Sequence, residues 1–211
     1  MSVAVQRSPL RRKLREQVAD SILDAAEQIA LEAGLGGMTV SAVATRAGVA
    51  VGTLYNYFPD SQGIIAALFR VRRNTLLPMI NAAATATKGL PFETRLRELV
   101  RHLLTAFDAH AAFIRLSVLA DRGGTKGKPR DTMLMTRTVH VLELVMREGA
   151  RRKLFAIRQA PVYARMMHGA LRSLYLWRMC SGTEPISADG DLLVDTFLHG
   201  IMPHARRAAS S

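Results

Sequence analysis

The sequence predicts an all-α protein. Apolar residues recur at helical spacing along nearly the whole chain, and no segment shows the alternation of a strand flanked by turn signals. Most of the breaks between the periodic segments contain glycine or proline, which would end one helix before the next begins. With 211 residues, of which 49% are hydrophobic, the chain is long enough to bury a sizeable core in one or two domains.

The first three expected helices form a helix-turn-helix. A stripe of apolar residues predicts a helix over 11–33, which a glycine-rich stretch ends. Thr39 offers an N-cap for a short helix that reaches residue 47, Gly48 suits the left-handed backbone of a tight turn, and a third short helix covers 50–57. We expect an inward-facing set on these helices, in which Ala44, Leu54 and Phe58 pack against Ile22, Ala26 and Ile29, with Val49 as an apolar plug.

Six further helices are expected after this head. Pro78 lies within the first of them and should kink it or end it early, because proline lacks the backbone N–H that a helix interior needs. The expected ranges are 61–87, 91–108, 110–121, 130–152, 160–180 and 187–207.

Charge points to an anionic partner, but its position matters more than its total. The chain has a net charge of +12, which favours nucleic acid or a membrane surface. In residues 1–62, however, six Lys and Arg balance six Asp and Glu, so the later residues carry the whole excess. The positive residues of the first stretch cluster near the N-terminus, at Arg7, Arg11, Arg12, Lys13 and Arg15. This local cluster is a better indication of DNA binding than the net charge.

Several classes of protein are disfavoured. The single cysteine, Cys180, allows no intrachain disulfide, which indicates a reducing compartment. The N-terminal residues are too polar for a secretory signal, and no run approaches the roughly 18 apolar residues that cross a bilayer, so we expect a cytoplasmic protein that does not use a membrane. The six histidines lack ligand spacing, and we find no nucleophile elbow, phosphate-binding glycine loop or paired acids. We therefore expect no metal, no cofactor and no enzyme activity.

The outward face of the third short helix is unusual for a protein surface, because it carries no charge. Hydroxyl and phenol groups there can donate to phosphate oxygens, an amide can read a base edge, and an apolar group can touch a thymine methyl. A glycine removes bulk where DNA must come close. An alternative reading makes Tyr57, like Phe58, a half-buried aromatic residue of a small core. The outward set is Val51, Gly52, Thr53, Tyr55, Asn56 and Tyr57.

These residues carry a resemblance to a known family. The segment Ala47-Gly48-Val49-x-x-Gly52-Thr53-Leu54-Tyr55-x-Tyr57-Phe58, together with Ile22–Ala26, Gly34 and Thr39-Val40, resembles the TetR family of bacterial transcription regulators over residues 15–70. The resemblance implies about nine helices, with three in a DNA-binding head and the rest in a ligand-binding body. It also implies a dimer that pairs through the last two helices and a repressor that a small molecule releases from DNA. By the same resemblance, Thr39 would contact phosphate and the outward set would face DNA.

The sequence departs from this family at two positions near DNA. Ala50 stands where the family commonly has serine, which removes a side-chain N-cap worth roughly 1 kcal/mol. Ser61 aligns where the family commonly has lysine near a phosphate. We predict that the basic arm, formed by Arg11, Arg12 and Lys13, compensates by reaching phosphates or the minor groove, and that Arg46 is another phosphate contact.

The body, residues 61–211, is expected to bind a small-molecule effector and to form the homodimer, whereas residues 1–60 would form the DNA-binding domain. A methionine of the body is more often a core residue than part of a pocket, and about half of the dimer positions could pack only within the subunit. The expected pocket lining is Phe107, Phe113, Leu116, Met133, His140, Tyr163, Met167 and Tyr175. The expected dimer contacts are Ala164, Leu171, Leu174, Leu192, Leu193, Phe197, Gly200 and Ile201.

The sequence therefore predicts a ligand-responsive regulator that binds double-stranded DNA, most simply a repressor on a palindromic operator. The basic segments 122–130 and 151–153 indicate either solvated charge or a site for an anionic ligand such as an acyl-coenzyme A. Two other classes stay open: a helical adaptor that has lost DNA binding, which Ala50 and Ser61 favour slightly, and a helical enzyme.

Overall fold

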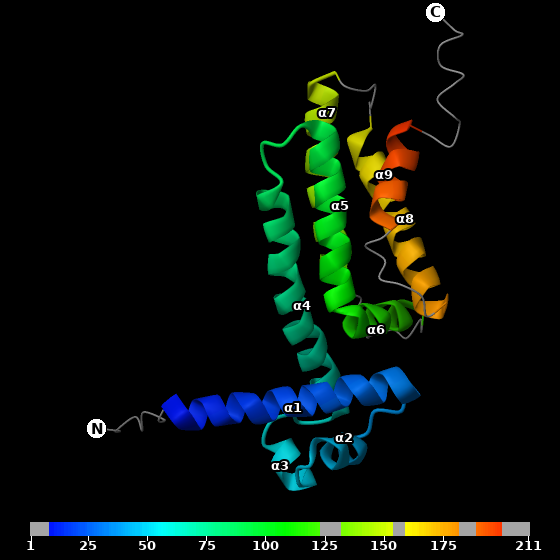
Figure 1. Cartoon of the computed structure of the whole chain (residues 1–211). Helices are drawn as coiled ribbons and strands as arrows, with labels where there is room; N and C mark the ends of the chain where they lie inside the picture. The colour runs from blue at the N-terminus through cyan, green and yellow to red at the C-terminus, as the bar shows by residue number, and fades with distance from the viewer. Residues whose placement is uncertain (1–8, 123–131, 154–158, 182–188, 200–211) are drawn as a thin grey trace, which may run out of the picture. The chain divides into compact units, whose positions relative to one another are not determined.

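The computed structural model describes residues 9–122, 132–153, 159–181 and 189–199, and within these ranges the chain forms nine α-helices and no strand (Figure 1). The all-α prediction is confirmed. The chain divides into two compact units, each described here by itself. The first combines residues 1–72 with 112–130, and the second combines 73–111 with 131–211. The predicted functional division at residue 60 stays a prediction.

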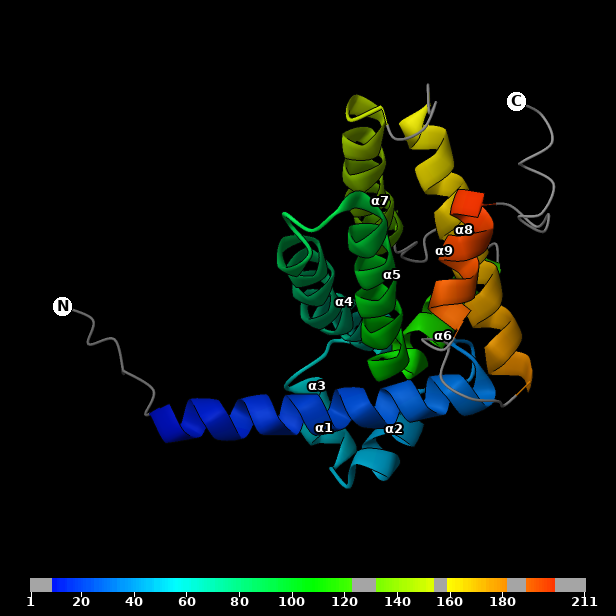
Figure 2. The ribbon, with the colours of Figure 1, turned by 45° about the horizontal axis from the view of Figure 1, so that its top comes forward.

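The first unit contains the helix-turn-helix. Its elements are α1 (Pro9–Ala33), α2 (Val40–Ala47), α3 (Val51–Tyr55), the first half of α4 (Ser61–Ala86) and nearly all of α6 (Ala111–Arg122). Helix α1 lies alongside α2 and α3, and its N-terminal end extends beyond them in both views (Figures 1 and 2). The predicted inward-facing set is buried, at Ile22, Ala26, Ile29, Ala44, Leu54 and Phe58, whereas Val49 is half-buried.

The turn between α2 and α3 is fixed by the residues that the sequence indicated. The hydroxyl oxygen of Thr39 accepts a hydrogen bond from the backbone N–H of Ala42 at 3.1 Å, which caps α2. Gly48 ends α2 with φ +66° and ψ 30°, a left-handed conformation that a Cβ would disfavour. Ala50 precedes α3 in an extended conformation without a side-chain cap. Helix α3 is shorter than predicted, because the chain leaves the helix at Asn56.

Helix α4 does not end at the proline within it. The helix runs through Pro78 to Ala86, so an early end at this residue was the wrong alternative. In the first unit, Arg72 of α4 forms ion pairs with Asp24 and Glu27 of α1, the latter at 2.9 Å. Because the side chains of Arg72 and Glu27 are largely buried, this cluster holds the first half of α4 against α1 more firmly than a surface pair would.

The second unit is a layered helical body. It combines the rest of α4 with α5 (Phe92–Ala109), α7 (Thr132–Arg151), α8 (Ala160–Ser181) and α9 (Gly190–His199). Helices α7 and α8 pack together, and α9 packs mainly on α5 (Figure 2). The first residue of α9 lies against two buried α5 side chains, because a Cβ at Gly190 would stand 3.1 Å from Leu104 and 3.4 Å from Val100. The predicted residues 200–207 of this helix lie outside the described ranges.

Ion pairs add to this packing. Arg95 of α5 pairs with Glu148 of α7, and both side chains are largely buried. Arg97 and Arg101 of α5 pair with Asp195 and Asp191 of α9, and these carboxylates are about half exposed. Exposed pairs contribute little, so α9 is held mainly by its apolar contacts. Among the described helices, none combines the length and the apolar character that crossing a membrane would require.

Candidate nucleic-acid interface

The solvent-facing side of α3 is the surface that the sequence predicted to meet DNA. Val51 is 42% exposed and Tyr55 is 54% exposed, and Gly52 and Asn56 are also exposed. Thr53 is half-buried, so its side chain lies at the edge of this surface. Leu54 points the other way and is fully buried, which anchors the short helix. The exposed side therefore carries one phenol, one amide and one apolar group, and no charged side chain.

Gly52 leaves open space on this surface. A Cβ built at this position would meet no atom within 4 Å, and its backbone lies in an ordinary helix. The protein itself therefore does not require glycine here. A missing side chain on an exposed recognition helix instead allows the backbone to approach a partner closely.

Two predicted phosphate contacts flank α3. The exposed Thr39 accepts a hydrogen bond as the cap of α2, and its hydroxyl proton is still available to donate. Ser61 is half-buried at the first position of α4. The carboxylate of Asp60 just before it accepts a hydrogen bond from the N–H of Gly63 at 2.7 Å, so Asp60 caps this helix.

Arg15, which belongs to the basic N-terminal cluster but not to the predicted basic arm, contacts the end of α3. Its guanidinium donates to the backbone carbonyl of Asn56 at 3.2 Å and lies over the ring of Tyr57, 5.4 Å from the ring centroid. Tyr57 is half-buried, as the alternative reading of this residue expected, and Phe58 is buried beside it. Arg15 and Asn56 are 41 positions apart, so no local pattern could have indicated the contact.

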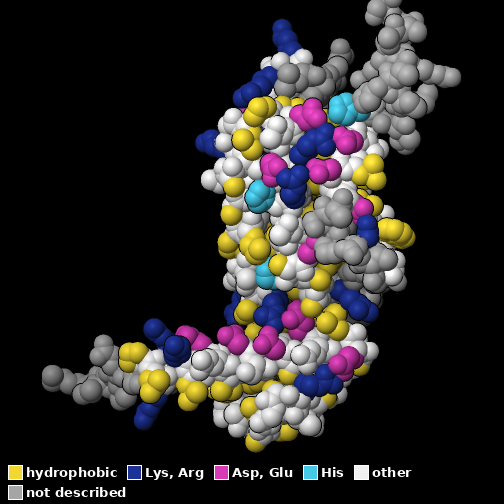
Figure 3. Space-filling model, in the orientation of Figure 1, with side chains coloured by type: hydrophobic (Ala, Val, Ile, Leu, Met, Phe, Trp, Pro, Cys, Tyr) yellow, Lys and Arg dark blue, Asp and Glu magenta, His cyan; other side chains and the backbone are white. Residues whose placement is uncertain are grey.

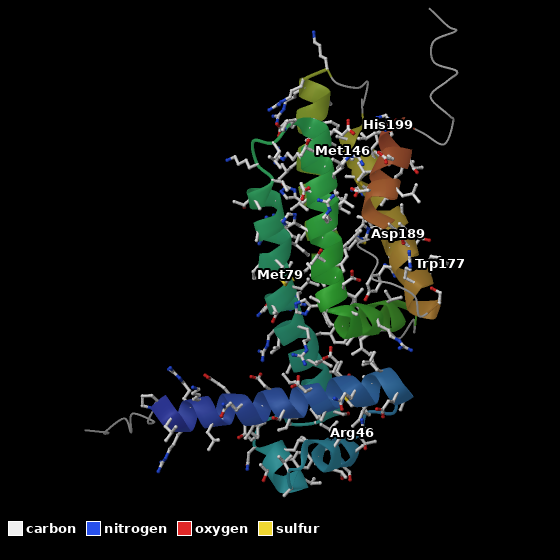
Figure 4. All side chains as sticks on the ribbon, in the orientation of Figure 1. Arg46, Met79, Met146, Trp177, Asp189 and His199 are labelled. Carbon is white, nitrogen blue, oxygen red and sulfur yellow. The ribbon has the colours of Figure 1, made fainter. Side chains whose placement is uncertain are left out.

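Arg46, the other predicted phosphate contact, already has a partner. It forms a bidentate ion pair with Glu32 of α1, in which its two terminal guanidinium nitrogens donate to the two carboxylate oxygens at 2.8 and 2.7 Å (Figure 4 labels Arg46 on α2). The hydrogen bonds from Arg46 hold the pKa of Glu32 below its usual value. A phosphate would therefore have to compete with this carboxylate for the guanidinium.

We expect the substitution Glu32→Gln to strengthen DNA binding, because it removes the negative charge that competes for Arg46. The predicted gain is about three- to tenfold in affinity at low salt, the size of one added phosphate contact. Titration of a labelled duplex would measure it. Adding Arg46→Gln to the Glu32→Gln variant should abolish this gain in affinity. If the double variant bound DNA as tightly as Glu32→Gln alone, Arg46 would not mediate the effect.

The helix-turn-helix segment matches a known protein family. Residues 22–68, which run from α1 through α3 into α4, match the family model described as bacterial regulatory proteins, tetR family. The predicted resemblance to the TetR family is confirmed over these residues. No curated protein sequence matches it. Solved structures of low identity share its fold: MbdR from Azoarcus sp. CIB has a TM-score of 0.75 at 18% identity, covering 88% of this chain and 100% of its own.

Two further structures are similar over most of their length. The transcriptional regulator FadR from Bacillus subtilis, in complex with stearoyl-CoA, has a TM-score of 0.72 at 18% identity and covers 87% of this chain and 99% of its own. The fatty acid degradation regulator FadR from Bacillus halodurans has a TM-score of 0.65 at 22% identity, covering 87% and 96%. At these identities the likeness supports the TetR-type fold alone.

The eight predicted effector contacts are divided between the two units of the structure. Phe113 and Leu116 are buried in the first unit, whereas the other six belong to the second. Within the second unit, Met167 and Tyr175 are buried, Phe107 and Tyr163 are half-buried, and Met133 and His140 are exposed. The hydroxyl of Tyr175 donates to the carbonyl of Ala111 at 3.1 Å, and burial, with a contribution from Asp108, raises its pKa above the usual range.

The predicted dimer contacts divide in a similar way. Ala164 and Leu171 are fully buried within the subunit, where a partner could not reach them without repacking. Leu174, Leu193 and Phe197 are half-buried, and Phe197 makes an edge-on contact with Tyr163 at 6.0 Å. Leu192 is exposed. Gly200 and Ile201 lie outside the described residues, as do most of the basic loop 122–130.

Metal chemistry finds no support in the described residues. No group of three His, Cys, Asp or Glu side chains in those ranges is placed to hold an ion. His168 is half-buried on α8, and burial lowers its pKa, with Arg172 as a further cause. A lowered pKa favours the neutral form of its imidazole near pH 7.

Proposed function

We propose that this protein is a transcription regulator that binds duplex DNA through α3 and leaves it when a small molecule binds the helical body. The observation that carries the proposal is the uncharged, exposed side of α3, presented by a TetR-type helix-turn-helix whose turn is fixed by Thr39 and Gly48. A recognition helix of this kind reads bases in the major groove while flanking groups hold the phosphates.

The roles of single residues follow from their chemistry. Asn56 would read a base edge, Val51 and the Thr53 methyl would touch thymine methyl groups, and Tyr55 and Thr39 would donate to phosphates. Gly52 would let the backbone come close. The DNA-binding domain would comprise residues 1–60, and residues 61–211 would sense the effector and form the dimer.

The effector would be a small apolar or amphipathic molecule. Buried methionines of the second unit, such as Met146 and Met167, suit apolar ligands of varied shape. The similarly folded FadR from Bacillus subtilis was crystallised with stearoyl-CoA, an amphipathic anion. Here the exposed Arg151 ends α7, and the exposed Arg152 and Lys153 follow it. Arg152 also pairs with Glu148 at 2.7 Å. Binding would shift the population of body conformations, with a coupling of roughly 1–3 kcal/mol.

The regulator would act as a homodimer with a two-fold axis, which in turn favours a palindromic operator. The homodimer is supported by an exposed apolar stripe on α8, which is formed by Val162, Met166 and Trp177. Leu192 is also exposed, on α9. Figure 4 shows the Trp177 side chain directed away from the other helices of the second unit. These exposed residues replace the buried Ala164 and Leu171 as the proposed contacts.

The substitution Met166→Asp is expected to shift the protein from dimer to monomer at micromolar concentration, because it places a charge in the centre of the stripe. Light scattering would report the mass, and circular dichroism the fold. Leu144→Asp is the matched control, since Leu144 is 45% exposed on α7 and Met166 is 58% exposed on α8. A dimer that persists in the Met166→Asp variant would contradict this arrangement.

A mobility shift with the DNA upstream of the protein's own gene tests the main proposal, because regulators of this kind often control neighbouring genes. We expect a retarded complex that random DNA does not displace. Absence of binding to this DNA and to a pool of random duplexes would favour the adaptor, and turnover of a substrate would favour the enzyme.

A further inference from the structure

The DNA-facing side of the head has few free positive charges. Duplex binding depends strongly on cations that neutralise phosphates, yet α3 carries none. Among the described head residues, Arg46 is paired with Glu32, and Arg72 is paired with Asp24 and Glu27. Cations for the phosphates must therefore come from elsewhere in the head.

The N-terminal end of α1 supplies them. Figure 3 shows Lys and Arg side chains gathered at this end, with acidic side chains farther along the same helix. Residues 9–17 are exposed and helical from Pro9 onward, so the basic arm is a rigid extension of α1. A helix does not fit the narrow minor groove as an extended chain does, which favours phosphates as the target of these residues.

Only one face of this helical extension points toward the end of α3. Arg11 and Arg15 continue, at helical spacing, the stripe that leads through Val18 to the buried Ile22. Lys13 lies on the opposite side of the helix. The guanidinium Nε of Arg12 lies 3.8 Å from the carboxylate of Glu16, so Arg12 is paired with an acidic group. The contact of Arg15 with the Asn56 carbonyl and the Tyr57 ring establishes that this face points toward the end of α3.

The partners of Arg15 leave its charge available. A carbonyl oxygen and an aromatic ring carry no net charge, unlike the carboxylates that hold Arg46 and Arg72. A guanidinium has five N–H donors, so hydrogen bonds to a phosphate can be added without breaking the one to Asn56.

We propose that Arg11 and Arg15 form a second DNA-binding surface on α1, which contacts the phosphates bordering the groove that α3 enters. Arg15 is also a positioning residue, because it fixes Asn56 and Tyr57 at the end of the recognition helix. The inference rests on the proposed function and changes the predicted basic arm: it adds Arg15 and removes Arg12 and Lys13.

The test is the salt dependence of DNA binding by the full-length protein. Affinities of Arg11→Gln, Arg15→Gln, the double variant and Lys13→Gln would be measured between 50 and 200 mM salt on the upstream DNA and on a random duplex. Each lost contact should lower the logarithmic slope by about 0.9, so affinity at 50 mM falls about three- to fourfold more than at 200 mM. Lys13→Gln should keep the wild-type slope.

Arg15→Lys separates the two roles of Arg15. Lysine keeps the charge but lacks the planar fork that reaches Asn56 and lies on Tyr57, so the slope should recover while specificity for the upstream DNA stays reduced. Because Arg11 and Arg15 are exposed, the double variant should keep its fold, which circular dichroism would check. A wild-type slope in the folded double variant would overturn the inference. If the wild-type protein bound neither DNA, the proposed function itself would fail.

Discussion

Replacing Gly52 with leucine should remove DNA binding and leave the fold intact. The site is exposed on α3, and a Cβ there meets no atom within 4 Å, so the side chain would project from the surface that we propose to meet DNA. Preventing this approach would cost several contacts, so we expect affinity to fall by much more than tenfold, which is a loss of more than about 1.4 kcal/mol of binding free energy. Titration of the upstream duplex measures the loss.

The same position allows a sharper comparison, because stability and binding should change in opposite directions. Alanine is favoured over glycine within a helix by up to about 1 kcal/mol, so Gly52→Ala should raise the melting temperature while it weakens binding. Gly36→Leu is the matched control, since that glycine of the same head is exposed and a Cβ there also has no neighbour. Equal binding by Gly52→Leu and the wild type would place the DNA surface elsewhere.

The second large effect is expected from Phe113→Ala, which should lower the free energy of unfolding by about 3–5 kcal/mol. The Phe113 side chain is 1% exposed and meets Phe69 of α4 edge-on, with ring centroids 5.5 Å apart. The sequence had suggested Phe113 as part of an effector pocket, whereas this packing indicates a core residue. Urea denaturation would measure the change.

A double-mutant cycle distinguishes the two roles of Phe113. Phe69→Ala and Phe113→Ala should be coupled by about 0.5–1.5 kcal/mol, the usual value for an aromatic pair beyond its burial. Phe107→Ala serves as the comparison, because that side chain is half-buried and should cost less. If Phe113→Ala lowered the free energy of unfolding by less than 1 kcal/mol and also weakened effector binding, Phe113 would be a pocket residue.

The head could be predicted in detail because its signals are local. A capping threonine and a glycine with positive φ act within a few residues of their own position, and Thr39 and Gly48 lie where the sequence placed them. Pro78 shows the limit of such rules, since its helix continues past it.

The body was harder to predict, because α8 is apolar on more than one face. Its buried face contains Ala164, Met167 and Leu171, and its exposed stripe contains Val162 and Met166. Sequence periodicity identifies such a helix but does not reveal which face turns to the body and which to a partner. The contact of Arg15 escaped prediction for a related reason, because it depends on how α1 crosses α3.

The shortness of α3 determines where loss-of-function mutations should arise. Five residues without a side-chain cap have almost no helical stability in isolation, so α3 depends on the burial of Leu54 beneath it. Any lesion that loosens the interior below would unravel the reading surface even when every exposed side chain is unchanged. Alleles that abolish regulation should therefore be found among hidden positions of the head at least as often as among those that touch the operator.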